Sequence, residues 1–125
     1  RHICAKIHDF ELHNFYVPAG GDEPDTLINP KYKHKLAYVE AMEQWFASNR
    51  LKSDNLILVG DLNIAPLEHD VWSSKQLSNV VSHTPFERTA LIKLQNSNRE
   101  IIKNIPNKIK KLSVEYKIEA SNKST

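Results

Sequence analysis

Residues 56–66 read Leu-Ile-Leu-Val-Gly-Asp-Leu-Asn-Ile-Ala-Pro, an apolar run that ends in glycine and is followed by a carboxylate and an amide. Four consecutive apolar residues predict a central strand that is covered on both faces. Asp61 and Asn63 follow Gly60 at the carboxyl end of this strand, where layered α/β folds place their ligands. Residues two apart point to the same side of an extended chain, so we expect Asp61 and Asn63 to lie on one face.

The Asp61 and Asn63 side chains suit the hydrolysis of a phosphodiester. An aspartate oxygen binds a hard cation such as Mg²⁺ or accepts a proton from water. An asparagine binds the same cation through its carbonyl oxygen or donates to a phosphoryl oxygen. The reaction needs a metal, an oriented water and donors to the non-bridging oxygens. The pattern is equally typical of a turn in which the aspartate accepts from nearby amides, and the spacing leaves both interpretations open.

The residues before this strand predict a hairpin, a loop and a helix. Alternating apolar and polar residues in 2–17 indicate two strands around a turn at His8 and Asp9. Residues 18–30 are rich in Pro, Gly and Asp and predict a loop. Apolar residues at helical spacing predict a helix over 31–49. We expect one face of the second strand to carry Phe10, Leu12, Asn14 and Tyr16, and the helix to bury Leu36, Val39, Met42, Trp45 and Phe46.

A second helix is predicted to begin at Thr84. Thr84 is able to cap it, Pro85 is tolerated at the first helical position, and Glu87 is placed to reach back to the amide of the cap. Its apolar stripe is predicted to comprise Phe86, Ala90, Leu91 and Leu94. The whole order of elements indicates an α/β fold, with α+β layering as the other form of the same pattern.

The composition fits one compact domain that acts in a reducing compartment. The chain has 125 residues, of which 40% are hydrophobic and 26% charged. No apolar run is long enough to span a bilayer, so we expect no membrane segment and a cytoplasmic protein. Cys4 is the single cysteine and is predicted to be a small buried residue. Neither a disulfide framework nor a thiolate-based zinc site is expected, and the six histidines show no zinc-binding spacing.

The charge is divided unevenly along the chain. Residues 99–125 carry seven Lys or Arg against three Glu, a net charge of +4, whereas the remainder carries ten basic against twelve acidic residues, a net charge of −2. We therefore divide the chain into a folded domain, 1–95, and a basic, poorly ordered tail, 96–125. The chain opens on Arg1 in strand-like sequence, which we interpret as a piece of a longer protein.

Several segments in order resemble one protein family. They are Asn14-Phe15-Tyr16-Val17-Pro18, the run 57–66, and the stretch from Asp70-Val71-Trp72 to Thr84-Pro85-Phe86-Glu87-Arg88. Together they resemble the exodeoxyribonuclease III, or apurinic/apyrimidinic endonuclease, branch of the endonuclease/exonuclease/phosphatase superfamily. The resemblance covers residues 1–95. It implies part of a four-layer sandwich, two β-sheets flanked by helices, that is incomplete at both ends.

The resemblance also implies an activity and roles for single residues. The family cleaves double-stranded DNA at abasic sites and removes nucleotides from 3′ ends, with Mg²⁺ or Mn²⁺ as cofactor. Asp61 matches the aspartate that orients and deprotonates the attacking water, and Asn63 the asparagine that positions the phosphate and helps the metal site. Tyr16 matches the tyrosine that contacts the scissile phosphate. Asn14 and Trp72 are weaker candidates for DNA contacts, and packing is the alternative role for Trp72. We expect a monomer.

The sequence departs from the family in ways that keep two other functions open. The metal-binding Glu of the family would lie before Arg1, and its closing Asp-His pair has no counterpart after Gln95, where the chain contains neither residue type. A site without these groups loses most of its transition-state stabilisation. The alternatives are therefore a catalytically dead remnant of the nuclease and a related phosphodiesterase that acts on a phospholipid.

Overall fold

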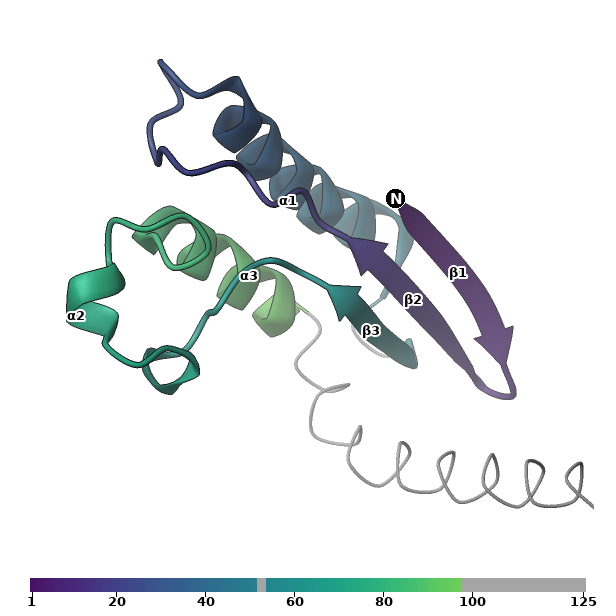
Figure 1. Cartoon of the computed structure of the whole chain (residues 1–125). Coiled ribbons are helices and arrows are strands. Elements are labelled where there is room, and N and C mark those ends of the chain that lie inside the picture. The colour runs from purple at the N-terminus through teal and green to yellow at the C-terminus, as the bar shows by residue number, and fades with distance from the viewer. Residues whose placement is uncertain (52–53, 98–125) are drawn as a thin grey trace, which may run out of the picture.

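The computed structural model describes residues 1–51 and 54–97 and contains a three-stranded sheet with its long helices on one side (Figure 1). β2 lies in the middle of the sheet and pairs antiparallel with β1 and parallel with β3. The elements are β1 (His2–Ile7), β2 (Phe10–Tyr16), α1 (Pro30–Asn49), β3 (Leu56–Asp61), the short helices η1 (Glu68–Asp70) and α2 (Ser74–Leu77), and α3 (Pro85–Ser97).

The layered α/β arrangement confirms the predicted fold class, with one correction in the sheet. β3 was expected to be a central strand covered on both faces, but within the described residues it pairs with β2 alone. Leu56 and Ile57 are buried, whereas Val59 and Asp61 are exposed. The prediction was wrong because an unbroken apolar run indicates a hydrophobic strand but not how many strands lie beside it. The described residues hold one of the two sheets that the resemblance implies.

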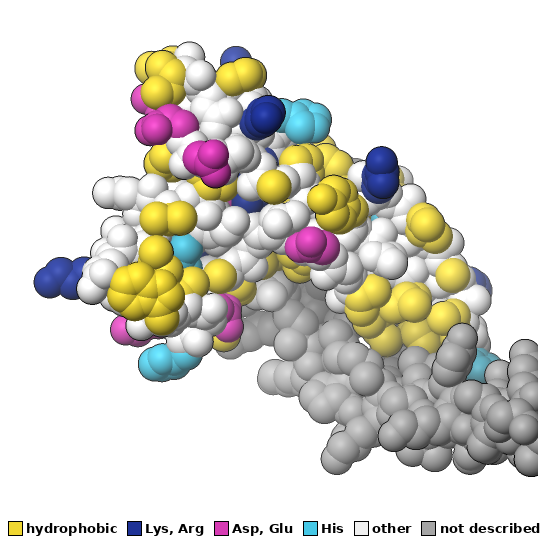
Figure 2. Space-filling view, viewed as in Figure 1, with side chains coloured by type: hydrophobic (Ala, Val, Ile, Leu, Met, Phe, Trp, Pro, Cys, Tyr) yellow, Lys and Arg dark blue, Asp and Glu magenta, His cyan; other side chains and the backbone are white. Residues whose placement is uncertain are grey.

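The hairpin was predicted correctly, and the structure shows which of its faces is buried. His13 and Phe15 of β2 are buried toward the helices, whereas Asn14 and Tyr16 lie on the opposite, exposed face. The more apolar face of β1 is likewise turned away, with Ile3 73% exposed. Figure 2 shows hydrophobic side chains gathered over the strands on this face. Cys4, expected to be buried, is exposed.

The core lies between the sheet and the two long helices. Phe15 and Leu56 of the sheet meet Val39 and Phe46 of α1, and α3 closes the cluster from its other side. Trp45 and Phe86, both predicted to be buried, are 39% and 77% exposed. The core residues are Phe15, Val17, Val39, Met42, Phe46, Leu56, Leu91 and Leu94.

Both predicted helix starts are close to the observed ones. The side chain of Asn29 accepts from the amide of Lys31 and caps α1, which therefore begins at Pro30, one residue before the predicted start. At α3, the amide of Glu87 donates to Oγ1 of Thr84, and the amide of Thr84 donates back to Oε2 of Glu87. This reciprocal pair is the predicted capping box.

Residues 96 and 97 are the part of the proposed tail that the structure describes. α3 continues to Ser97, two residues past the predicted boundary at 95. The rest of the segment proposed as a basic tail lies outside the described residues. Within the described ranges, none of the helices is both long and apolar enough to cross a membrane.

A buried ion pair between α1 and α3 was not predicted. The ammonium of Lys35 lies 2.6 Å from Oε1 of Glu87, and both side chains are 0% exposed. Lys35 also donates to the carbonyl oxygens of Ala19, at 3.1 Å, and Asn63, at 2.6 Å. Its three N–H groups therefore have three acceptors, from the loop after β2, the turn after β3 and the start of α3.

We expect Lys35→Met to lower the free energy of unfolding by about 3–5 kcal/mol, because it leaves the Glu87 carboxylate buried without its counterion. Urea unfolding of the full chain measures this loss. Lys93→Met is the matched control, since it breaks an ion pair with Glu43 in which Lys93 is 68% exposed. The control should lose less than about 1 kcal/mol, and equal losses in both variants would contradict the assigned role of Lys35.

Candidate functional site

The candidate site lies where β2 and β3 end together. Tyr16 and Asp61 are direct register partners in this parallel pair, so their side chains leave the sheet on the same face. The amide of Val17 donates to the carbonyl oxygen of Asp61 at 2.9 Å and extends the pairing past the last strand residues. Tyr16 is 52% exposed and Asp61 is exposed, so both side chains are open to a ligand from solvent.

Asn63 is held beside this pair by a turn and not by continued strand geometry. The strand ends at Asp61, and Asn63 adopts a left-handed conformation with φ 49°. Its backbone amide donates to Oδ1 of Asp61 at 3.2 Å, and its Nδ2 donates to the carbonyl oxygen of Val17 at 2.8 Å. The turn that was open as an alternative interpretation is therefore present. It coexists with the site, because it brings the side chain of Asn63 back to the end of β2.

The buried side chain of Lys35 holds this turn in position from the side of the core. Its ammonium donates to the backbone oxygen of Asn63, and Ala19, which it also contacts, lies three residues after Tyr16. The spacing of Tyr16, Asp61 and Asn63 in the sequence does not indicate Lys35. The helical spacing of the buried residues of α1 does indicate it. The buried positions of α1 are Tyr32, Lys35, Val39, Met42 and Phe46. This spacing alternates three and four residues and passes through Lys35, whereas the predicted Leu36 is only partly buried.

The two weaker candidates differ in their relation to the site. Asn14 precedes Tyr16 by two residues on the same exposed face, and its Oδ1 lies close to Gly60. Trp72 follows η1 and takes part in none of the hydrogen bonds that join Tyr16, Asp61 and Asn63. Because Trp72 is 75% exposed, packing against the described residues does not account for it.

Comparisons with known proteins agree with this fold. An AP endonuclease from Archaeoglobus fulgidus superposes with a TM-score of 0.69 at 30% sequence identity, over 77% of this chain and 36% of that chain. This likeness is consistent with the exodeoxyribonuclease III branch that the sequence motifs resemble. A 3′-5′ exonuclease of this branch, NExo from Neisseria meningitidis, matches with a TM-score of 0.65 at 25% identity and the same coverage.

A further solved structure shares the fold. The 3′ phosphatase NExo from Neisseria bound to a product DNA hairpin has a TM-score of 0.66 at 24% identity, again over 77% of this chain and 36% of that chain. The chain thus spans about a third of the length of these exodeoxyribonuclease III-type structures. Searches with family models and against curated proteins found nothing that matches.

Gly60 sets the separation of the two strands at the site. Its φ is +124°, and a Cβ placed there would lie 2.0 Å from the backbone oxygen of Phe15 and 2.6 Å from Oδ1 of Asn14. No side chain fits without separating β2 from β3, because the nearest obstacle is backbone. Glycine at position 60 is therefore needed for the adjacent Tyr16 and Asp61 to stay in register.

We expect Gly60→Ala to lower the free energy of unfolding by about 3 kcal/mol or more, from backbone strain and the clash with Phe15 together. Gly21→Ala is the matched control. It shares a positive φ of +70°, but its Cβ would first meet a side-chain atom, Nδ2 of Asn29, at 3.1 Å. The control should lose only about 1–2 kcal/mol. Equal urea midpoints for the two variants would refute the close approach of the strands.

Proposed function

We propose that this chain carries the Tyr16, Asp61 and Asn63 part of the active site of a DNA-repair nuclease that hydrolyses phosphodiesters at abasic sites and 3′ ends. The register that sets Tyr16 beside Asp61, with Asn63 returned to the same strand ends, is the observation that carries the proposal. The likeness to an AP endonuclease and to a 3′-5′ exonuclease supports the choice of DNA as substrate.

Each side chain has a role that its chemistry allows. The Asp61 carboxylate accepts the proton of the attacking water as a general base. The Tyr16 hydroxyl donates to an oxygen of the scissile phosphate, where negative charge increases in the transition state. One N–H of the Asn63 amide is used by Val17, and the other is left to donate to the phosphate. The hydrogen bond to Val17 also holds the amide in place before substrate arrives.

The donor set fits the Mg²⁺ or Mn²⁺ that the family uses. A carboxylate of Asp61 and an amide oxygen of Asn63 are the hard ligands that such cations prefer, and the two residues are linked by a direct hydrogen bond. When bound, the cation would neutralise charge on the phosphate. Asp61 and Asn63 supply two ligands, so further ligands must come from water, substrate or groups elsewhere in the protein.

We expect Asp61→Asn to lower Mg²⁺-dependent nicking of a duplex that carries one abasic site by about 10²–10⁴-fold, the usual contribution of a general base. Asparagine keeps the oxygen that accepts from the amide of Asn63, so the turn should survive. Cleavage is measured on a denaturing gel with Mg²⁺ and with EDTA. Asp22→Asn, which changes an exposed carboxylate in the loop before α1, is the control and should retain full activity.

The outcomes separate the proposed nuclease from its alternatives. Metal-dependent nicking that is lost in Asp61→Asn and kept in Asp22→Asn supports the proposal. If the wild type nicks the duplex no faster than Asp61→Asn does, the catalytically dead remnant is the better explanation. Hydrolysis of a phospholipid without cleavage of DNA would favour the related phosphodiesterase.

We also propose that Trp72 contacts the DNA, since an exposed indole offers a flat surface on which a base stacks. Trp72→Ala should weaken binding to the abasic duplex by about fivefold or more, measured by fluorescence anisotropy in EDTA. Phe86→Ala removes another exposed aromatic ring, 77% exposed on α3, and serves as the control. Equal affinities for wild type and Trp72→Ala would remove Trp72 from the DNA-binding surface.

A further inference from the structure

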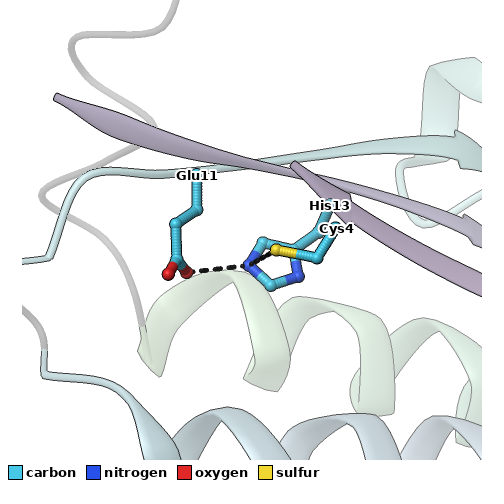
Figure 3. Close-up of side chains that lie close together, drawn as sticks. All are labelled: Cys4, Glu11 and His13. Carbon is cyan, nitrogen blue, oxygen red and sulfur yellow. Dashed lines mark hydrogen bonds and ion pairs between the residues drawn. The ribbon is translucent and has the colours of Figure 1, made fainter. Parts of the chain in front are cut away.

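Three side chains with metal-binding atoms meet on the helix-facing side of the hairpin, away from the candidate active site. They are Cys4 of β1 and Glu11 and His13 of β2, and their ligand atoms all lie within 4.8 Å of one another. Figure 3 shows the three side chains directed from the strands toward the helices. None of the roles proposed above uses them.

Two of the three ligand-atom distances within the cluster are close to those of a tetrahedral metal centre. Sγ of Cys4 lies 3.6 Å from Nε2 of His13, and Oε2 of Glu11 lies 3.1 Å from the same nitrogen. A zinc ion at its usual bond lengths holds a sulfur and a nitrogen about 3.6 Å apart, and a nitrogen and an oxygen about 3.3 Å apart. Little movement is needed to bring the two pairs into coordination.

The surroundings of His13 direct Nε2 into the cluster. Its other nitrogen, Nδ1, lies 2.9 Å from Nε2 of His2, and the His2 ring stacks on Phe15. In the tautomer in which Nδ1 of His13 donates to His2, the Nε2 lone pair of His13 is left for a metal, as in the outer shell of many zinc sites.

Glu11 is oriented by Arg50. The guanidinium donates to Oε2 at 2.8 Å and to Oε1 at 3.2 Å. A metal ion would replace the His13 contact at Oε2 and compete there with Arg50, whereas Oε1 keeps its bond to the guanidinium. A thiolate and a carboxylate together balance a divalent charge, and the exposure of Cys4 leaves room for water as a fourth ligand.

We propose that Cys4, Glu11 and His13 form a binding site for a thiophilic divalent metal such as Zn²⁺, distinct from the proposed Mg²⁺ site. His13 lies on the opposite face of β2 from Tyr16. Glu11 precedes Tyr16 by five residues, a distance on the order of 15 Å along the strand. A metal here joins β1 to β2. The thiolate ligand selects against Mg²⁺, which prefers oxygen donors.

Co²⁺ titration of the full-length chain tests the proposal, because a cobalt–thiolate bond has a charge-transfer absorption band that oxygen and nitrogen ligands do not produce. We expect the band in the wild type, its removal by added Zn²⁺, and its persistence in excess Mg²⁺. Cys4→Ser should abolish the band. This exposed, nearly isosteric change should leave the fold intact, which circular dichroism checks.

Two more variants distinguish a three-ligand site from a cysteine that binds metal alone. Glu11→Gln should lower Zn²⁺ affinity by at least tenfold, and His2→Phe, which keeps the ring against Phe15 but removes the acceptor for His13, by about 10–100-fold. His34→Ala, which removes an exposed histidine on α1, is the matched control and should bind Zn²⁺ as the wild type does.

Absence of the band in folded wild type would overturn the proposal, as would a band whose strength and Zn²⁺ affinity are unchanged by Glu11→Gln and His2→Phe. The cluster would then be an ion pair of His13 and Glu11 beside an unrelated thiol. The readout does not involve DNA cleavage, so the result is independent of the proposed nuclease function.

Discussion

The ion pair of Lys35 and Glu87 is the contact on which the other parts of the structure depend. One ammonium, with no exposure to solvent, joins the loop after β2, the turn after β3 and the first turn of α3. Glu87 in turn accepts from the amides of Ser82 and Thr84 and from the Thr84 hydroxyl. Burying both charges is costly, and the cost is offset because every donor of Lys35 and both oxygens of Glu87 are paired.

This network connects the core with the candidate site. The strand ends alone set Tyr16 beside Asp61, but Asn63 lies beyond the strand in a left-handed turn. Its side chain is held by Val17 and its backbone by Lys35, so α1 contributes to the site through a buried side chain. Pre-positioned donors of this kind lose little free energy to reorganisation when a substrate binds.

The sheet has two faces with different chemistry. The face toward the helices carries the histidine, thiol and carboxylate cluster of the hairpin together with Phe15, whereas the exposed face carries Ile3, Asn14 and Tyr16. The alternation of the hairpin predicted two strands and their turn correctly, since period two is a local property. It did not determine which face is buried, because that depends on where the helices pack.

The sequence by itself determined the local structure: the hairpin, the two long helices with the cap of the second, the apolar strand and the turn residues at Gly60 to Asn63. These follow from side-chain period, caps and backbone preference over a few neighbouring residues. It also identified Asp61 and Asn63 from their place after the apolar strand and Tyr16 through the family resemblance, and their roles stay proposals. Only the tertiary structure decided which face is buried, that Lys35 pairs with Glu87, and that Cys4 meets Glu11 and His13. Lys35 and Glu87 are far apart in the chain, and Cys4 meets Glu11 and His13 across two paired strands, so these contacts depend on how the elements pack.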